Sequence, residues 1–219
     1  MATYRQAQQD EAQRQVFLDT FFQRNPNDNV EALTYNLHKK PGLDRITKLQ
    51  FAGAVDADVA DELRKVAYES TQYAFLLITP KMIGKRDRHP IFVNPRAFNE
   101  LSEADFEYNI VDHEYMHTHD FRFGIPLPNG TVINHTNAGQ LQPVTLEAVL
   151  DSRALMYQLM KGREKGMQDS EAFMNAIHGF LKYHHALKGV QPVNDFEREV
   201  IKTQVASYQG ILPEHLREK

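Results

Sequence analysis

Two histidines and a glutamate in the middle of the chain have the types and spacing of a metal-dependent hydrolytic site. His113, Glu114 and His117 form an H-E-x-x-H pattern. Residues four apart on a helix lie above one another on one face, so both imidazoles could point at a single ion. The Glu114 carboxylate would lie at the edge of that face, where it can take a proton from a zinc-activated water. The pattern predicts zinc-dependent hydrolysis of a carbonyl compound.

The helix around this pattern predicts that the histidines face the protein core. With 100° per residue, Phe106, Ile110, His113 and His117 fall within about 60° of one another. The opposite side carries Asp105, Tyr108, Asp112 and His119. Two imidazoles on an apolar face need polar partners, and a shared metal ion would satisfy both. The alternative is a pair of histidines that are hydrogen-bonded in the core or solvated.

A catalytic zinc ion needs a third protein ligand, and the chain has no cysteine to supply it. His119 points about 200° away from His117 around the helix, which makes it a poor candidate. The longer metzincin pattern needs glycine at position 120 and histidine at position 123, where this chain has Asp120 and Phe123.

A carboxylate on a second helix remains for the third ligand. On the helix expected from Thr145 to about Lys161, Glu147, Asp151 and Gln158 share a stripe about 40° wide on an otherwise apolar surface. Buried carboxylates need a cation or strong donors. The alternative is a solvated edge whose carboxylates pair with Arg153 or Lys161.

The combined pattern resembles the gluzincin metallopeptidases, the thermolysin-like branch of the zincins. Their H-E-x-x-H is followed on a later helix by a glutamate and, four positions on, an acidic residue. The resemblance spans roughly residues 73 to 161, and it implies zinc held by His113, His117 and Glu147, with Asp151 orienting one histidine through its second ring nitrogen. The asparagine that often precedes the glutamate in this group is Leu146 here.

A looser resemblance connects the chain to ImmA/IrrE-type minimal metallopeptidase domains. It rests on the short strand Ile91–Asn94 before the motif helix and on the helix that carries Glu147. The zincin resemblance implies that this strand lines the cleft and pairs with an extended peptide or protein substrate.

A donor that stabilises the tetrahedral oxyanion is expected downstream of the second helix. The preferred residue is His184, on a helix that is unusually rich in donors. The alternatives are His135, Tyr157, His178, Tyr183 and His185. Any single histidine among them could instead be a surface residue near a helix C-terminus.

Hydrophobic periodicity and turn residues predict an α+β fold that is dominated by helices. The expected helices span 3–23, 58–70, Ser102 to about Asp120, Thr145 to about Lys161, 169–187 and 194–208. Ser102 and Thr145 are expected to cap the N-termini of their helices. Apolar runs at 73–79 and 90–94 predict two strands, antiparallel if a hairpin joins them, and 131–134 a third. We expect a zincin-like domain over 56–219, with a small, mainly antiparallel sheet and two metal-site helices, preceded by an N-terminal helical extension over 1–55.

The composition is that of an ordinary soluble protein. The chain has 219 residues, 42% of them hydrophobic and 25% charged, and a formal charge of −4. The charge argues against a nucleic-acid partner, and the absence of a signal-like segment or long apolar run predicts a cytoplasmic protein without a membrane partner. Three functions remain: a metallopeptidase, a zinc hydrolase of small amides or esters, and a metal-dependent sensor without turnover. An intact Glu114 favours the two hydrolases.

Overall fold

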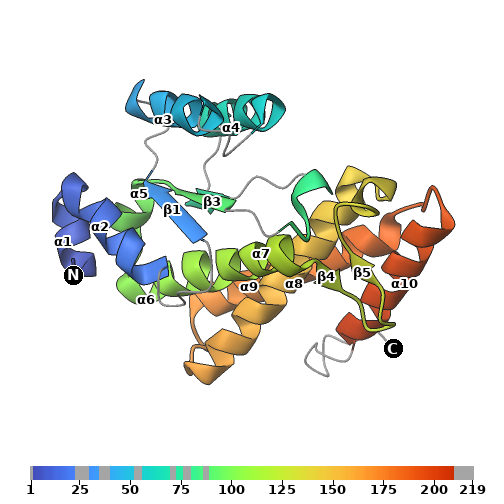
Figure 1. Ribbon diagram of the computed structural model, residues 1–219. Coiled ribbons are helices and arrows are strands. Elements are labelled where there is room, and N and C mark those ends of the chain that lie inside the picture. The colour runs from blue at the N-terminus through green and yellow to red at the C-terminus, as the bar shows by residue number, and fades with distance from the viewer. Residues whose placement is uncertain are drawn as a thin grey trace. The chain divides into compact units, whose positions relative to one another are not determined.

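The structure is a computed structural model that describes residues 2–22, 30–34, 40–51, 56–69, 73–75, 80–85 and 89–209. The elements are labelled in Figure 1. The chain divides into two compact units: unit 1 comprises Met1–Thr79 with Asp87–Glu114, and unit 2 comprises Pro80–Arg86 with Tyr115–Lys219. Helices dominate and the sheets are small, so the predicted α+β class is confirmed at this coarse level.

Unit 1 contains a three-stranded mixed sheet. Its strands β1 (Val30–Thr34), β2 (Ala74–Phe75) and β3 (His89–Val93) have the order β1-β3-β2. β3 pairs antiparallel with β2, as predicted, and parallel with β1, which the sequence pattern did not predict. Residues 76–79 of the predicted strand lie outside the described residues.

Strand β3 lies in the middle of this sheet. Ile91, Phe92 and Val93 are all buried, as expected for a strand covered on both faces. Phe92 and Val93 are paired with both neighbouring strands. The expectation that this strand offers a free edge to an extended substrate is therefore wrong at these two residues.

The N-terminal helices α1 (Tyr4–Gln9) and α2 (Glu11–Phe22) belong to the core of unit 1. Four rings pack with centroids 5.0 to 6.0 Å apart: Tyr4, Phe17, Phe98 and Phe106. The Tyr4 hydroxyl also donates to the carbonyl groups of Ala97 in α5 (Arg96–Glu100) and of Leu101, the residue that follows this helix. The structure thus divides the chain elsewhere than at the expected boundary after residue 55, because aromatic residues before and after that point share one core.

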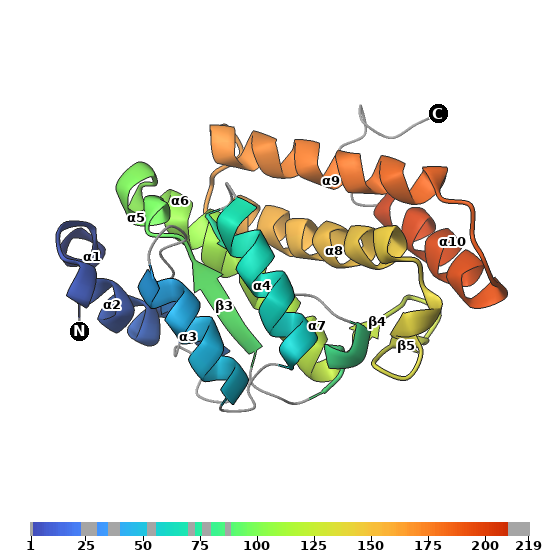
Figure 2. The ribbon, with the colours of Figure 1, turned by 90° about the horizontal axis from the view of Figure 1, so that it is seen from above.

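Helices α3 (Lys40–Phe51) and α4 (Ala57–Glu69) lie side by side in unit 1 (Figure 2). The Arg64 guanidinium on α4 donates to the Thr47 hydroxyl and to the Gln50 amide oxygen on α3. Helix α4 is the one predicted at 58–70, whereas α3 lies in a stretch for which the sequence pattern indicated no regular element.

The motif helix runs without a break through α6 (Glu103–Phe106), a π-helical segment (Glu107–Val111) and α7 (Asp112–Phe123). Ser102 caps its start as predicted, because its hydroxyl oxygen accepts from the Asp105 backbone at 3.1 Å. The helix ends a few residues after the expected Asp120. Gly124 terminates it with φ +82° and donates its N–H to the Asp120 carbonyl.

The π-helical segment changes which residues face the core. Uniform 100° spacing placed Tyr108 and Asp112 on the far side, yet Tyr108 is 0% and Asp112 8% exposed. A π segment takes up about one extra residue relative to an α-helix, which shifts the phase of the following turn by roughly 100°. Tyr108 within the segment and Asp112 directly after it are therefore both buried. The predicted burial of Phe106, Ile110 and His117 is confirmed.

Unit 2 contains most of α7, a small hairpin and three further long helices. Strands β4 (Ile125–Pro126) and β5 (Val132–Ile133) pair antiparallel, and β5 is the strand predicted at 131–134. The helices are α8 (Pro143–Glu164), α9 (Glu171–Gly189) and α10 (Asp195–Gln209), all close to the predicted ranges. Helices α8 and α9 lie along each other (Figure 2). A side chain at Gly179 would meet Leu155 at 3.2 Å, so glycine permits this close packing.

The start of α8 differs from its prediction. Thr145 was expected to cap the helix, but α8 begins at Pro143, and Thr145 lies in its first turn. The cap comes from α10: the Glu197 carboxylate accepts from the Gln142 backbone at 2.9 Å and from the Thr145 hydroxyl at 2.5 Å. A carboxylate suits this position because helix N-termini carry unpaired N–H groups and a partial positive charge.

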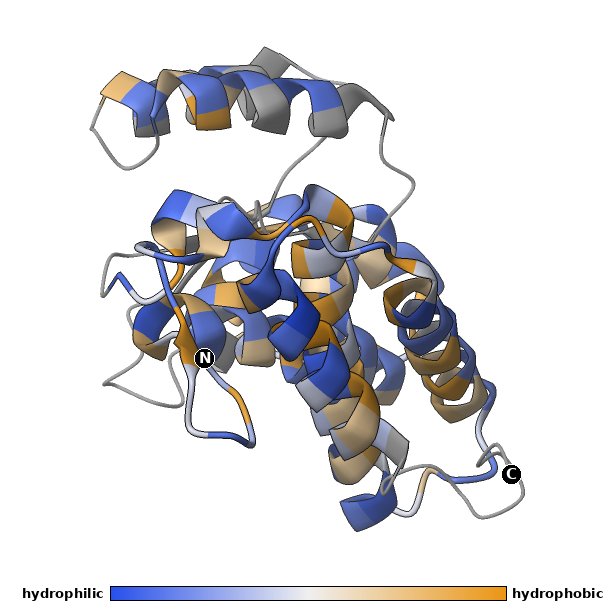
Figure 3. Ribbon diagram, turned by 90° about the vertical axis from the view of Figure 1, so that its right-hand side faces the viewer, coloured by the Kyte–Doolittle hydropathy of each residue, from blue (hydrophilic) through white to orange (hydrophobic). Residues whose placement is uncertain are grey.

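Hydrophilic and hydrophobic residues alternate around the helices of the structure (Figure 3). In the described ranges, we find no helix with the length and apolar character needed to cross a bilayer.

Candidate metal centre

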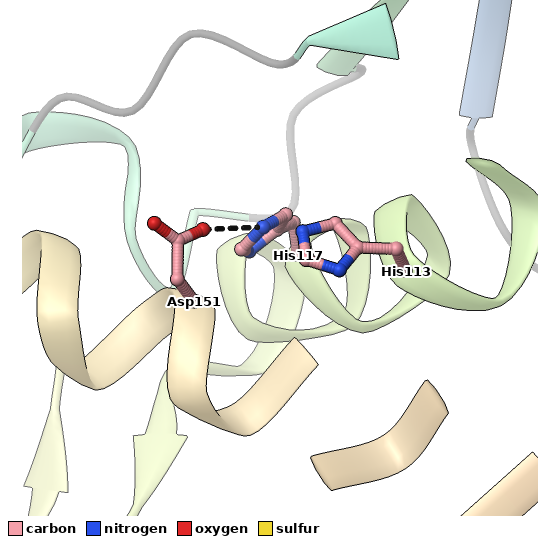
Figure 4. Close-up of side chains that lie close together, drawn as sticks. All are labelled: His113, His117 and Asp151. Atoms are coloured by element: carbon pink, nitrogen blue, oxygen red, sulfur yellow. Dashed lines mark ion pairs between the residues drawn. The ribbon is translucent and has the colours of Figure 1, made fainter. Parts of the chain in front are cut away.

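Three of the residues singled out in the sequence come together on helices α7 and α8. His113, His117 and Asp151 each offer a ligand atom, and these atoms lie within 4.8 Å of one another. The two imidazoles project from α7, and the carboxylate reaches toward them from α8 (Figure 4). His117 Nε2 lies 3.3 Å from Asp151 Oδ1. The structure thus supplies two nitrogen donors and one carboxylate oxygen at one point.

The helix α7 itself fixes the relation between the histidines. The spacing of four residues places His113 and His117 one turn apart on the same face, as predicted. His117 is 3% exposed, and His113 is half-buried. One imidazole therefore belongs to the core, and the other is accessible to solvent.

A buried ion pair joins α7 to α8 beside this group. The Arg153 guanidinium donates to both oxygens of Asp120, at 2.8 and 2.9 Å. The Asp120 side chain is fully buried. Arg153 thus pairs with Asp120, and Lys161 pairs with Glu164.

Tyr183 on α9 contacts the group from a third helix. Its hydroxyl donates a hydrogen bond to the Asp151 carboxylate. Burial, together with the negative charges of Asp151 and Glu147, raises the pKa of Tyr183 well above its ordinary value. Tyr183 therefore stays protonated at neutral pH and can keep donating to Asp151.

The two glutamates of the predicted site lie in different surroundings. Glu114 is 5% exposed on α7, next to His113. Glu147 is exposed on α8, one turn before Asp151, and although it is among the described residues it lies outside the group of three. The structure therefore places Asp151, and not Glu147, against the histidines. The ligand role that the gluzincin resemblance gives to Glu147 stays a prediction.

The donor set fits zinc in kind, and one of its separations fits zinc in length. Zinc binds histidine nitrogen and carboxylate oxygen at about 2.0–2.2 Å with tetrahedral geometry, which puts neighbouring ligand atoms roughly 3.3–3.5 Å apart. The separation of 3.3 Å between His117 and Asp151 matches that spacing. The widest separation among the three ligand atoms is at most 4.8 Å.

The predicted oxyanion donor, His184, lies in the packing of α9 against α10. It is 3% exposed, stacks with Phe180 at a ring distance of 6.4 Å, and meets Tyr208 edge-on at 6.1 Å. Its catalytic role stays a prediction. Its neighbour Tyr183 is the residue of this helix that contacts Asp151.

The remaining candidate donors are dispersed. His178 and His185 are exposed on α9. His135 is exposed in a turn after β5, where its backbone N–H donates to the Ile83 carbonyl. Tyr157 on α8 stacks with Tyr115 on α7 at a ring distance of 5.7 Å.

Two features of the site were missed in the sequence. The Asp120–Arg153 pair joins residues 33 positions apart, and no local pattern marks such a contact. The contact between Tyr183 and Asp151 likewise depends on how α9 packs on α8. A weak signal existed for Tyr183, because it belongs to the donor-rich run that ends at His185.

Comparison with protein-family models, characterised proteins and solved structures gave no significant match to this chain. Inferences about function therefore depend on the residues and their geometry.

Proposed function

We propose that this protein is a zinc-dependent hydrolase of the peptidase type, with His113, His117 and Asp151 as the protein ligands of the ion. The observation that supports this most is the placement of their three ligand atoms within 4.8 Å of one another. Two imidazoles and one carboxylate are a typical catalytic ligand set, which leaves one coordination position for water or substrate.

Bound at this group, zinc would polarise a substrate carbonyl and lower the pKa of water toward 7. The chain's own residues would do the rest. Glu114 accepts the proton of the attacking water and passes it to the leaving amine. Its low exposure, 5%, keeps the carboxylate away from bulk water. Tyr183 holds the Asp151 carboxylate by a hydrogen bond, an outer contact that orients a ligand.

A hydrolase accounts for Glu114 better than a metal sensor does, because a site that only binds metal has no need of a general base beside its ligands. The H-E-x-x-H pattern, with a carboxylate supplied by a later helix, favours peptide bonds as the substrate class. In this proposal Asp151 takes the place that the gluzincin resemblance assigns to Glu147.

The ligand set is tested by measuring the zinc dissociation constants of wild type, Asp151→Asn and Glu147→Gln by competition with a chromogenic chelator. Both substitutions remove one negative charge from the same face of α8, so they form a matched pair. We expect Asp151→Asn to weaken zinc binding by more than about 100-fold, beyond the 10- to 100-fold typical of outer contacts. Glu147→Gln should bind like wild type. The reverse result would make Glu147 the ligand and reduce Asp151 to an orienting residue.

Catalysis is tested with a mixture of quenched fluorescent peptides and a panel of small anilides and esters. Glu114→Gln should retain zinc and lose at least about 100-fold in rate, the usual contribution of a general base. Cleavage of the small substrates alone would replace the peptidase assignment by a small-molecule hydrolase. A wild-type protein that takes up no zinc at micromolar concentration would refute the proposal altogether.

A further inference from the structure

The ion pair between Asp120 and Arg153 is largely buried and has a bidentate geometry. The guanidinium makes two parallel hydrogen bonds, at 2.8 and 2.9 Å, to a carboxylate that is 0% exposed. The Arg153 side chain is only 11% exposed. A bidentate pair of this kind fixes both distance and orientation, because the guanidinium and the carboxylate are planar.

The pair engages the same two helices as the proposed ligands. Asp120 follows His117 by three residues, so both lie on neighbouring parts of one face of α7. Arg153 follows Asp151 by two residues, which places it about 200° away around α8. The contacts His117–Asp151 and Asp120–Arg153 therefore reach α7 from opposite sides of α8. A rotation of α8 about its own axis would stretch at least one of them.

The pair also restrains α8 along its length. One helical turn is 5.4 Å, and Glu147 precedes Asp151 by about one turn. A slide of α8 by that distance would bring Glu147 toward the histidines in place of Asp151. Apolar packing alone would hold two helices together, but it is not directional and resists sliding less. The two hydrogen bonds of Arg153 would be lost after a displacement of about 1 Å.

Stability alone is a weak reason for an ion pair at this position. The desolvation of two buried charges offsets much of their attraction, and apolar residues of similar volume often give equal or greater stability. What an apolar pair does not supply is a fixed register between the helices.

We propose that Asp120 and Arg153 are positioning residues that set the rotation and register of α8 on α7, so that Asp151 and not Glu147 serves as the third metal ligand. This inference rests on the proposed function in that it assumes a metal ion at His113, His117 and Asp151.

The test separates positioning from folding by replacing the ion pair with apolar residues. The variant Asp120→Leu/Arg153→Met fills the contact with apolar side chains and removes its direction. We expect the metal-free double variant to unfold at or above the wild-type temperature. Its affinity for zinc should nevertheless fall about 10- to 100-fold, the range for contacts that orient a ligand. Adding Glu147→Gln to the double variant should weaken zinc binding further, although Glu147→Gln in the wild-type background should leave zinc affinity unchanged.

Arg153→Gln and Arg198→Gln provide a matched comparison. Arg198 pairs with Asp195 on the surface of α10, with both side chains well exposed. Arg198→Gln should leave zinc affinity within about twofold of wild type, since exposed pairs contribute little. Arg153→Gln isolates a buried charge and should weaken both folding and zinc binding; if it fails to fold, the double variant still decides the question.

Wild-type zinc affinity in Asp120→Leu/Arg153→Met would overturn the inference and leave the proposed function intact. A wild-type protein that binds no zinc would instead refute the proposed function, and the positioning role with it. The two failures are therefore distinguishable in one set of titrations.

Discussion

Replacing Glu197 by glutamine should loosen the start of α8, the helix that carries Asp151. Glu197 is fully buried on α10 and accepts four hydrogen bonds. Their donors are the backbone and side-chain N–H groups of Gln142, the Thr145 hydroxyl and the Val193 backbone. A glutamine amide has one oxygen, so it can replace only one side of this arrangement and turns its NH₂ toward the other donors.

The size of the effect follows from the donors that lose an acceptor. With the amide oxygen facing the Gln142 backbone N–H and Thr145, the amide NH₂ opposes the Val193 N–H and the Gln142 side-chain N–H, which Glu197 accepts at 2.9 and 3.1 Å. One buried donor without an acceptor costs about 1–3 kcal/mol, and the lost charge weakens the remaining bonds. We expect a total loss of about 2–4 kcal/mol in the free energy of unfolding. For a chain of this size that lowers the melting temperature by about 4–16 °C.

The loss should depend on pH. Burial alone would raise the pKa of Glu197, but the hydrogen bonds from Thr145, Val193 and Gln142 outweigh it and hold the pKa below the ordinary 4.5. The folded state therefore binds this proton less readily than the unfolded chain. The resulting stabilisation is fully present above pH 4.5 and is lost as the pH falls through the folded-state pKa. The difference between wild type and Glu197→Gln should shrink from pH 7 to pH 3.

The assay is urea unfolding followed by circular dichroism between pH 7 and pH 3. Glu199→Gln is the matched control, because Glu199 is exposed on the same helix and should change stability by less than about 0.5 kcal/mol. Equal stability of the two variants at pH 7, or a difference that does not vary with pH, would refute the capping role of Glu197.

Three further outcomes are expected. Gly124→Ala should cost about 1–3 kcal/mol, because its φ is +82° and a Cβ would meet Val132 at 2.7 Å; Gly139→Ala, with open space around it, is the control in the same denaturant titration. Tyr4→Phe should lower stability by about 0.5–1.5 kcal/mol through the loss of its hydrogen bonds to the end of α5, and an unchanged urea midpoint would contradict this. A free zinc concentration of about 100 times the wild-type dissociation constant should stabilise wild type by about 2.7 kcal/mol in thermal scans. A similar gain for Asp151→Asn at the same zinc concentration would argue against Asp151 as a ligand.

Local patterns in the sequence were sufficient to predict most of the helices and the arrangement of the two histidines. The spacing of His113 and His117 translates directly into neighbouring positions on α7, since the geometry of a helix is local. Ser102 and Gly124 marked the ends of the helical run for equally local reasons. The strand Val30–Thr34 escaped prediction because its partner, β3, lies about 60 residues later in the chain.

Two predictions from local sequence patterns were wrong. The π-helical segment Glu107–Val111 shifts the helical phase, so Tyr108 and Asp112 are buried against expectation. Thr145 lost its expected capping role because a carboxylate from α10 performs it. Neither effect can be predicted from residues within a few positions of Tyr108, Asp112 or Thr145.

The sequence by itself determined that two imidazoles and the Glu114 carboxylate would share one helix, and that two carboxylates on a later helix were available to join them. Which carboxylate meets the histidines was decided by tertiary structure alone. Glu147 and Asp151 lie on the same face of α8, and helical periodicity cannot distinguish them. Asp151 lies at His117, and the Asp120–Arg153 pair and the hydrogen bond from Tyr183 are further contacts of the same two helices. The relative position of two helices is set by such contacts between residues distant in the chain.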